Sequence, residues 1–451
     1  MDVVTHPGTI RRAFSDRLYT FVAGQSGGMD TRGDNPLRRI AVLLPIAYRG
    51  GSLRGFKTIA KMLRKGSAAA GEPVEVVAAF PASSYDERQD FSDLVEAGIQ
   101  LRPFEWKVID RTTLARAIGF MSDERVNLAD YSESIVPDDG INNLLDCDFW
   151  LVVSDRLRHP LAPLRPAGYM IYDYIQRMRP DVFPGGFDDH SFVSNVRHAE
   201  FVLCTTPFTA DAAVAYAGVR RSQVHLVDME IETDLDERIA GGQVQGSRRP
   251  YILWPCNSSP HKNQLAALDA LEIYFARHSG ALDVICSGLN TDWFDWRAKP
   301  IDEHAYPGVK AVRERIARSP LLRKRVHMVG ELMEADYFAT VAGARFLFHP
   351  ALVDNGTYAV TEAAWLGVPS LSHDYPAIRW MDERFGLALA YCDARDPLQT
   401  ARALAEMERI APLRKTLLPS RDSLRRHGWA SHAAGFWKTV SGLMTRCKRA
   451  A

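Results

Sequence analysis

Short apolar runs alternate along the chain with longer amphipathic or polar segments. The runs that we interpret as buried strands are 39–45, 74–80, 149–153, 169–172 and 201–204 in the first half, and 251–254, 282–286, 326–329, 345–348, 370–372 and 388–391 in the second. Continuous apolar runs of this length, separated by crossovers, are typical of parallel sheets covered by helices on both faces. The pattern therefore predicts two doubly wound α/β domains.

The segment 241–250, Gly-Gly-Gln-Val-Gln-Gly-Ser-Arg-Arg-Pro, separates the two sets of strands. It is small and polar and it is closed by proline, which is the composition of an interdomain linker. The boundaries that follow are an N-terminal extension 1–38, an N-terminal domain 39–240, the linker 241–250, a C-terminal domain 251–428 and a last amphipathic helical segment 429–451.

Two carboxylates eight positions apart, Asp354 and Glu362, frame a turn of small residues. An apolar run precedes the turn and a helical segment follows it, so the turn is expected at the carboxyl end of a strand and at the start of a helix. The N–H groups at a helix start attract an anion such as phosphate, whereas a carboxylate accepts hydrogen bonds from sugar hydroxyls. The turn therefore favours a nucleotide-sugar ligand.

A lysine, Lys262, lies where the first strand of the second half leads into a helix. The N-terminal end of a helix is already positive, so a lysine there requires an anion. A diphosphate would supply that anion. The alternative is a solvated surface lysine, and the co-occurrence with the acidic turn favours the functional interpretation.

Composition narrows the class of protein. The 451 residues include 55 lysines and arginines and 55 aspartates and glutamates, so no net charge indicates nucleic acid as a partner. The six cysteines show no C-x-x-C spacing, which favours a reducing, cytoplasmic compartment. Because no apolar run approaches the roughly 20 residues of a membrane span, and the start of the chain lacks a signal-peptide core, any membrane contact is expected to be peripheral.

Other chemical motifs are weaker. The chain has no G-x-S-x-G elbow and no P-loop, so the hydrolase and kinase hypotheses lose their main support. Asp146 and Asp148 form a D-x-D sequence, but it precedes a strand and is expected at the amino end of the sheet, away from ligands. The segment 188–190 and the isolated histidines His327, His349 and His373 lack zinc-site spacing and are interpreted as structural.

Several segments in a fixed order resemble the retaining glycosyltransferases of family 4. In chain order they are Tyr48-Arg49-Gly50-Gly51, Tyr172-Asp173, 204–210, Pro260-His261-Lys262-Asn263, Val329-Gly330-Glu331-Leu332, His349-Pro350-Ala351, the turn from Asp354 to Glu362, and 372–379. The resemblance covers residues 39 to about 445 and is more specific in the C-terminal part. It implies the GT-B fold, in which two Rossmann-like domains face each other and the last helix crosses back to the N-terminal domain.

The resemblance implies a role for each matched position on the C-terminal side. Glu362 would hold the ribose hydroxyls of the nucleotide, and Asp354, one methylene shorter than the family's usual glutamate, would contact the donor sugar. Lys262 would bind phosphate. The remaining predicted donor-binding residues are Asn257, Gly330, Glu331, Gly356, Thr357 and Tyr358, of which the last three would offer their backbone to the diphosphate.

On the N-terminal side the glycines Gly50 and Gly51 match a loop that approaches the sugar diphosphate, where a missing Cβ permits close contact. Tyr172 and Asp173 fall where the family has His-Asp beside the donor sugar and the acceptor. The predicted catalytic set is thus Asp354, Lys262, Tyr172 and Asp173.

Two departures from the family pattern affect the site. Cys256 stands where the family often has an arginine, so Arg49 or Arg54 is a candidate to assist Lys262. Tyr172 replaces a histidine and removes a group that titrates near neutral pH, which weakens any proton role inherited from the family.

The resemblance implies an enzyme that needs no metal or bound cofactor. It would transfer a hexose or deoxyhexose, with GDP-mannose slightly favoured as the donor, to a glycan, lipid-linked or protein-linked acceptor in surface polysaccharide or glycoconjugate synthesis. The alternatives are a GT-B phosphorylase, a nucleotide-sugar epimerase, and a non-catalytic GT-B protein that binds a glycan or a partner.

The C-terminal segment is basic and aromatic, with Trp429, Phe436 and Trp437 among its residues. Such a segment could dock on the inner face of an anionic membrane. The favoured interpretation is that these aromatic side chains pack the last helix against the N-terminal domain, as the GT-B resemblance implies. The two hypotheses are compatible if the basic face stays exposed.

Overall fold

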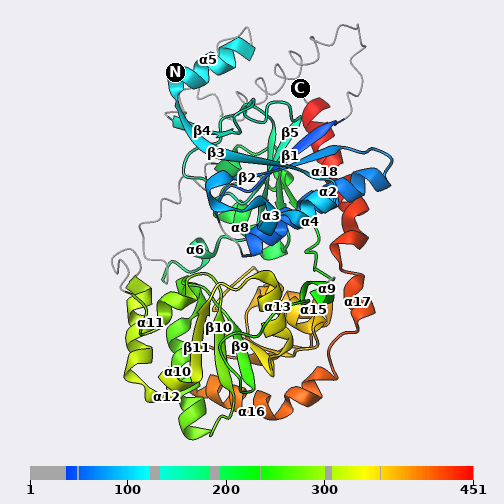
Figure 1. Ribbon diagram of the computed structural model, residues 1–451. Helices are drawn as coiled ribbons and strands as arrows, with labels where there is room; N and C mark the ends of the chain where they lie inside the picture. Colours follow the sequence, from blue (N-terminus) through cyan, green and yellow to red (C-terminus); the bar gives the residue numbers. More distant parts are fainter. Residues whose placement is uncertain are drawn as a thin grey trace. The chain divides into compact units, whose positions relative to one another are not determined.

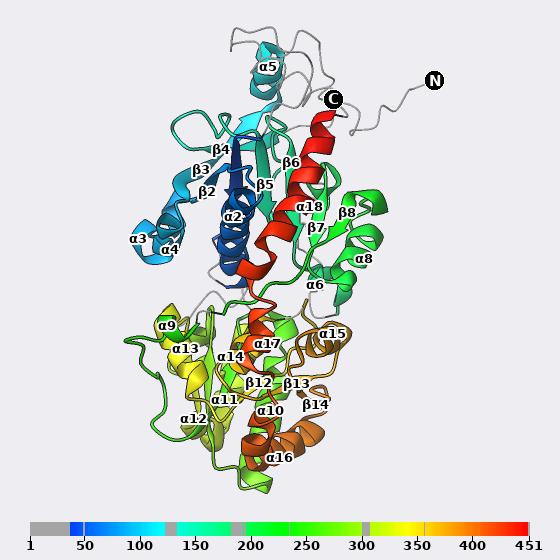
Figure 2. The same cartoon turned by 90° about the vertical axis from the view of Figure 1, so that its right-hand side faces the viewer.

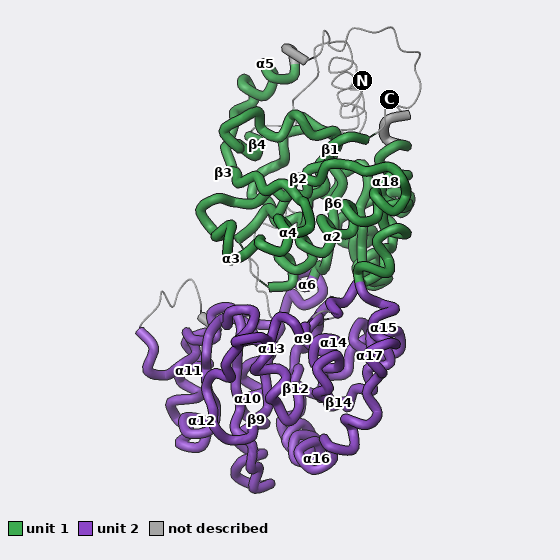
Figure 3. The backbone as a smooth tube through the Cα atoms, turned by 45° about the vertical axis from the view of Figure 1, so that its right-hand side comes forward, with its two compact units in different colours: residues 1–174, 186–229, 429–451 green, residues 175–185, 230–428 purple. Residues whose placement is uncertain are grey.

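The computed structural model describes residues 37–47, 50–121, 133–181, 193, 195–233, 235–299, 307–355 and 357–449. Tyr48, Arg49, Gly356 and the segment 188–190, which the sequence singled out, lie outside these ranges. The chain forms two compact units, shown in Figure 3: unit 1 comprises Met1–Tyr174, Gly186–Met229 and Trp429–Ala451, and unit 2 comprises Ile175–Gly185 and Glu230–Gly428.

Unit 1 is built on an eight-stranded sheet (Figure 1). Its strands, in spatial order, are β4 (Glu133–Asp138), β3 (Gln100–Asp110), β2 (Glu75–Pro81), β1 (Arg39–Leu43), β5 (Phe149–Val153), β6 (Ala167–Ile171), β7 (Val202–Cys204) and β8 (Val224–Leu226). All neighbours are parallel except β3 and β4. The central strands β1 and β5 are buried along their apolar lengths, as expected for a parallel sheet covered on both faces.

Helices and short turns connect these strands. They are α2 (Gly51–Ala69), η1 (Ala82–Ser84), α3 (Glu87–Asp90), α4 (Ser92–Glu96), α5 (Arg111–Met121), α8 (Pro207–Ala215), η2 (Arg221–Gln223) and the final helix α18 (Trp429–Arg449). One apolar core lies on each face of the sheet. Leu43, Trp150 and Tyr169 belong to one core, and Val42 and Phe149 belong to the other.

The final helix α18 lies along α2, and the contact is visible in Figures 1 and 2. Phe436 and Trp437 are buried in the core that covers this face of the sheet. A Cβ on Gly66 of α2 would come within 2.1 Å of the Ala433 carbonyl oxygen, so the glycine permits the close approach of the two helices. The prediction that the last helix packs on the N-terminal domain is confirmed. Among the described helices, none has the length and apolar character of a membrane span.

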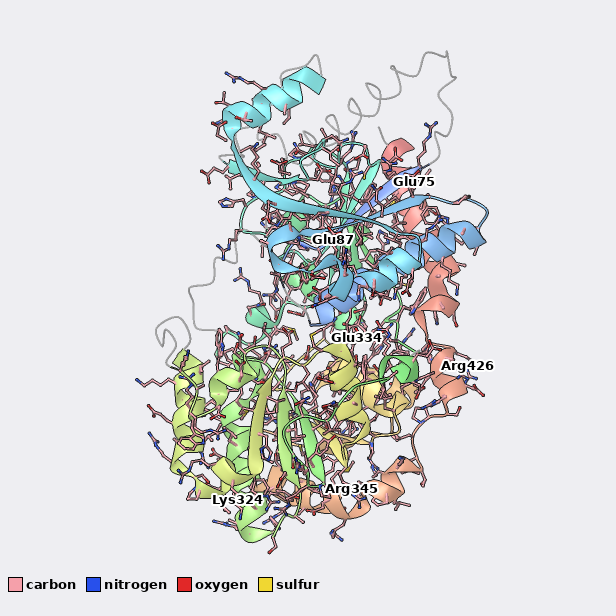
Figure 4. The ribbon with its side chains drawn as sticks, in the orientation of Figure 1. Glu75, Glu87, Lys324, Glu334, Arg345 and Arg426 are labelled. Carbon is pink, nitrogen blue, oxygen red and sulfur yellow. The ribbon has the colours of Figure 1, made fainter. Side chains whose placement is uncertain are left out.

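Unit 2 contains a six-stranded, fully parallel sheet. Its strands, in spatial order, are β11 (Val326–Gly330), β10 (Asp283–Ser287), β9 (Tyr251–Pro255), β12 (Phe346–His349), β13 (Ser370–His373) and β14 (Ala390–Cys392). Figure 4 labels Glu334 at the carboxyl edge of this sheet and Lys324 and Arg345 at the opposite edge. The sequence placed the strands of this unit within a few residues of their positions.

Unit 2 also contains helices and short helical turns. They are α6 (Ile175–Met178), α9 (Leu235–Arg238), η3 (Pro260–Lys262), α10 (Gln264–Arg277), η4 (Thr291–Phe294), α11 (Pro307–Arg318), α12 (Pro320–Arg325), α13 (Glu334–Ala342), α14 (Tyr358–Trp365), α15 (Pro376–Phe385), α16 (Pro397–Lys415) and α17 (Arg421–Arg425).

The segment 241–250, which was predicted to link the two domains, lies within unit 2. Residues 230–240 already belong to unit 2, and the segment itself is bound to that unit. The backbone N–H of Gln243 donates to Asp336 at 2.8 Å, and the Ser247 hydroxyl donates to Asp283 at 2.9 Å. These side-chain acceptors, which lie far away in sequence, fix the segment. The chain passes between the units at 174/175, 185/186, 229/230 and 428/429.

Candidate functional site

The turn between β9 and α10 presents Lys262 at the carboxyl edge of the sheet of unit 2. The helical turn η3 ends at Lys262, and Asn263 follows in the left-handed conformation with φ 61°. The Asn263 side-chain amide donates to the carbonyl oxygens of Pro350 at 3.3 Å and Ala394 at 2.8 Å. One asparagine thus joins the loops that follow β9, β12 and β14, which holds the lysine at a fixed place on this edge.

The acidic turn follows β12 on the same edge. The backbone N–H of Leu352 donates to the His261 carbonyl oxygen at 2.9 Å, which ties this turn to η3. Asp354 orients its carboxylate by accepting a bond from the Asn355 N–H at 2.9 Å. The helix α14 then begins at Tyr358, and Thr357 caps it by accepting a hydrogen bond from the Ala359 N–H.

Lys262 and Asp354 form an ion pair in this structure. The Nζ atom lies 2.5 Å from Oδ2 of the carboxylate, and each side chain is 15% exposed. Burial alone would raise the pKa of Asp354, but the Lys262 ammonium, followed by the imidazoles of His349 and His261, holds that pKa well below its usual range. Lys262 was predicted to require an anion, and in this structure the Asp354 carboxylate is that anion.

His349 and Ser372 lie behind the ion pair. His349 ends β12, and its Nδ1 atom lies 3.2 Å from the hydroxyl oxygen of Ser372 on β13. Both residues are buried. Burial, and then the Lys262 ammonium, lower the pKa of His349, whereas Asp354 raises it. His349 was predicted to be structural, which agrees with its burial, and it also lies beside the Asp354 carboxylate, with Nε2 3.9 Å from Oδ2.

The second acid of the spaced pair, Glu362, lies on α14. Its side chain is 4% exposed and accepts a hydrogen bond from the Tyr337 hydroxyl of α13 at 3.0 Å. The two acids of the spaced pair therefore lie in different environments. Asp354 is paired with a cation, and Glu362 is bound to a hydroxyl group.

The other predicted donor-side residues differ in what they expose. Thr357 and Tyr358 stand at the start of α14, as expected, and Gly356 between the acids lies outside the described residues. Gly330 has φ 77°, and its N–H and carbonyl are both used, by Thr291 and by Gly288. Gly330 therefore shapes the turn with its backbone groups already bonded. The remaining two, Asn257 and Glu331, follow β9 and β11 at the same edge, and Asn257 Oδ1 accepts from the Ser259 N–H at 2.9 Å.

On unit 1 the predicted residues also follow the carboxyl ends of strands. Tyr172 and Asp173 come directly after β6, and Asp173 accepts a hydrogen bond from Arg156, after β5, at 3.1 Å. The Tyr172 hydroxyl rests on α2, where a Cβ on Gly55 would come within 1.7 Å of it. Gly50 and Gly51 stand at the start of α2.

A buried acid that the sequence analysis missed, Asp155, lies at this edge of unit 1. It follows Ser154, which has φ 96°, a left-handed value that is uncommon for a residue with a side chain. Burial, which outweighs the opposing effect of Arg156, raises the pKa of Asp155 to about 7. The Tyr174 hydroxyl faces this carboxyl group but has no well-formed hydrogen bond. A polar residue directly after a buried strand was the available sequence signal.

This buried acid gives a testable pH dependence. The ordinary pKa of Asp155 is 3.8 and its folded value is about 7, so the folded state binds a proton that the unfolded state has lost between these values. The free energy of unfolding should therefore decrease as the pH rises from 4 to 7, by up to about 4 kcal/mol from this group. Asp155→Asn should remove that decrease, so the variant gains stability over the wild type as the pH rises.

Urea unfolding at pH 5 and pH 8 measures this gain. Asp211→Asn serves as the control, because Asp211 is an acid of the same unit whose side chain is 71% exposed in its pair with Arg221. If Asp155→Asn and Asp211→Asn change the pH profile equally, the assignment of a protonated Asp155 is wrong.

The D-x-D sequence lies at the amino end of the unit 1 sheet, away from this edge. Asp146 accepts hydrogen bonds from Arg102 at 2.7 and 2.9 Å and forms an ion pair with Arg39. The hydrogen bond from Arg102 is the main cause that lowers the pKa of Asp146 to about 2. Asp148 accepts from the backbone N–H groups of Arg38 and Arg39. Both acids are therefore engaged in holding β1.

The chain is similar to known proteins in its structure and not in its sequence. Neither a family model nor a curated protein sequence matches the chain. Solved structures do match over most of its length. A glycosyltransferase from Rickettsia africae has 11% identity and a TM-score of 0.59, with 92% of this chain and 100% of that chain covered.

Two further structures give similar values. HepE from Anabaena in complex with UDP and glucose has 15% identity and a TM-score of 0.61, with 90% of this chain and 100% of that chain covered. Sucrose-phosphate synthase from Thermosynechococcus elongatus has 12% identity and a TM-score of 0.58, with 91% of this chain and 100% of that chain covered. At such low identities a likeness establishes the fold, and the chain accordingly has the GT-B fold of the glycosyltransferases that its sequence resembles.

Proposed function

We propose that the protein is a retaining glycosyltransferase that uses a nucleoside-diphosphate sugar as its donor. The observation that carries this proposal is the edge of unit 2, where Lys262, Asp354 and the start of α14 are held together by bonds between three loops. An ammonium and a helix start suit a diphosphate, and two carboxylates suit the hydroxyls of the sugar and the ribose. The GT-B fold supports the same class of reaction.

The proposed division of roles follows the chemistry of the groups. Lys262 and the N–H groups at the start of α14 bind the diphosphate and stabilise the charge that develops on it as the sugar leaves. Asp354 accepts hydrogen bonds from the sugar, and Glu362 from the ribose. Because the ammonium and the helix start supply positive charge to the leaving group, we propose that no divalent metal is needed.

We assign acceptor binding to unit 1. Asp173 and Tyr172 follow β6 at the carboxyl edge of its sheet, and Gly50 and Gly51 at the start of α2 are proposed to approach the sugar diphosphate. Carboxylate and phenol groups recognise hydroxyls, so the proposed acceptor is a glycan, free or lipid- or protein-linked. The proposed sugar is a hexose or deoxyhexose.

The test is sugar transfer or slow donor hydrolysis by the pure protein. A panel of nucleotide sugars that includes GDP-mannose and UDP-glucose is screened first by thermal shift, since a bound ligand raises the melting temperature. The stabilising donor is then assayed for turnover with and without a metal chelator. Binding without any transfer or hydrolysis would favour a non-catalytic GT-B protein, and turnover that needs manganese or magnesium would contradict the metal-independent proposal.

Glu362→Ala should weaken the binding of the free nucleoside diphosphate by about 1.5–3 kcal/mol, the cost of losing a hydrogen bond to a charged group. The control is Tyr337→Phe, which removes the hydrogen bond at 3.0 Å but leaves the carboxylate for the ribose. Calorimetry with both folded variants compares the two losses. Unchanged affinity in Glu362→Ala would remove the proposed ribose contact.

A further inference from the structure

One oxygen of the Asp354 carboxylate faces two basic groups. Lys262 Nζ lies 2.5 Å from Oδ2, and His349 Nε2 lies 3.9 Å from the same oxygen. Among the described residues, no group is within hydrogen-bonding distance of His349 Nε2, although the residue is only 1% exposed. A second nitrogen is therefore buried beside the carboxylate without a hydrogen bond of its own.

The bonding of Ser372 favours the neutral tautomer of His349 that carries its hydrogen on Nδ1. The Ser372 hydroxyl lies 3.1 Å from the His373 carbonyl oxygen and 3.4 Å from the His349 carbonyl oxygen, and both can only accept. When its single hydrogen goes to one of these carbonyls, the hydroxyl oxygen accepts from His349 Nδ1 at 3.2 Å. A neutral imidazole that carries its hydrogen on Nδ1 leaves a bare lone pair on Nε2.

The titratable and charged groups around His349 come from three loops. Lys262 and His261 lie on η3, and Asp354 lies after β12. His373 ends β13, and Tyr375 follows it. The ring centroid of Tyr375 lies 6.2 Å from that of His349 and 6.2 Å from that of His373. The Lys262 ammonium is the cation nearest to the shared carboxylate oxygen. While it stays there, it opposes a second positive charge on His349.

We propose that His349 takes over from Lys262 as the cationic partner of Asp354 when a nucleoside diphosphate binds. The idea rests on the proposed function, because it takes Lys262 as a ligand of the diphosphate. As the ammonium turns from Oδ2 to the phosphate, Nε2 of His349 takes one proton from solvent and donates it in a hydrogen bond to Oδ2. No covalent bond to carbon changes, and the charge of the Asp354 site is kept in balance.

The exchange has a physical reason. A carboxylate that is 15% exposed and loses its cation is left nearly unpaired, and such a charge is strongly unfavourable. His349 is fixed by Ser372 at a distance that a small movement can close. Asp354 therefore stays ionised and oriented for the sugar hydroxyls while Lys262 serves the diphosphate, and His349 is a positioning residue of the donor site.

The first test is isothermal calorimetry of the full chain with UDP or GDP, whichever binds more tightly, in PIPES, HEPES and Tris at pH 7. The slope of the observed enthalpy against the ionisation enthalpy of the buffer counts the protons that are taken up. The wild type should take up about one proton more per site than His349→Asn, whose amide keeps the bond to Ser372 but does not titrate. The protons that the nucleotide itself loses are the same in both measurements.

The second test needs no ligand. In Lys262→Met the cation is absent, so the pKa of His349 should rise by about one unit or more, followed by NMR of ¹³C-labelled histidine rings. The matched control is Lys262→Met/Asp354→Asn, which removes the carboxylate as well and should cancel the rise. The His349 signal is identified by its absence in His349→Asn, or by its response to Ser372→Ala if that variant does not fold.

The outcomes separate the two proposals. If neither nucleotide binds the wild type, the proposed function fails, and the exchange, which needs that ligand, fails with it. If a nucleotide binds with equal proton uptake in wild type and His349→Asn, the exchange is overturned while the proposed function stands. An unchanged pKa of His349 in Lys262→Met overturns the exchange as well.

Discussion

Lys262→Met should weaken binding of the nucleoside diphosphate by about 1.5–3 kcal/mol and lower kcat/KM by about a hundredfold or more. The binding loss reflects a charge-assisted bond to phosphate, and the further loss reflects charge stabilisation in the transition state. Above the pH at which His349 is protonated in this variant, the same change should also destabilise unit 2, because Asp354, which accepts from Lys262 at 2.5 Å, then has no cationic partner. Breaking a buried pair from one side costs about 3–5 kcal/mol, and the partial exposure of this pair places the expected cost at the lower end.

The double variant Lys262→Met/Asp354→Asn separates the two effects. It removes both charges, so the free energy of unfolding should return towards that of the wild type, whereas affinity for the diphosphate should not. Urea unfolding and calorimetry on the three proteins measure both quantities. Recovery of nucleotide affinity in the double variant would show that Lys262 acts only as the counter-ion of Asp354 and is not a phosphate ligand.

Gly288→Ala should be among the most damaging single changes in unit 2, with an expected loss of about 3 kcal/mol or more in the free energy of unfolding. Gly288 follows β10 with φ 136°, which only glycine adopts readily, and a Cβ would come within 1.9 Å of the Cys256 carbonyl oxygen. That oxygen belongs to backbone, so the clash cannot be relieved by turning a side chain. The turn that carries Asn257 and Lys262 must then move.

Gly386→Ala is the matched control for this position. It also has positive φ, 65°, but nothing lies within 4 Å of an added Cβ. Its cost should be about 1–2 kcal/mol, the conformational penalty alone, and nucleotide affinity should be unchanged. Chemical unfolding and nucleotide titration of both variants test the difference. Equal costs at the two glycines would mean that the turn after β9 can shift without resistance.

The strands that the sequence predicted well are those buried on both faces. Runs such as 149–153 and 251–254 are continuously apolar, so their burial in β5 and β9 could be inferred from composition. The strand β3 was missed because its sequence mixes charged and apolar residues and contains Pro103. The charged residues are tolerated because one part of β3 pairs with β4 near solvent. The short β8, Val-His-Leu, has too few apolar residues to give a signal.

The candidate site was predicted as a set of residues and not as a geometry. Spacing along the chain placed Lys262 and Asp354 at the same edge of one sheet, because parallel strands end together. Their ion pair depends on the direction of two side chains 92 positions apart, which no local pattern encodes. The partners of His349 were hidden for the same reason, since β12 and β13 become neighbours only when the sheet forms.

Asp155 was missed for a different reason. A single acid after an apolar strand is common at the surface, and its burial arises from Tyr174 and the loops around it.

The segment 241–250 was predicted from its composition alone. Its composition predicted a link between the two domains, but the segment lies within unit 2, where Asp336 and Asp283 accept hydrogen bonds from it. Composition reports what a segment can do alone, and tertiary partners decide what it does.

The placement of α18 in unit 1 has a consequence for the order of folding during synthesis. Unit 1 owns the first part of the chain and its last helix, while nearly all of unit 2 is translated between them. The apolar face of α2 that packs against Phe436 and Trp437 therefore stays exposed until the final helix has left the ribosome. All strands of the unit 2 sheet are synthesised before that point, so unit 2 can fold while one face of the unit 1 sheet still lacks α18.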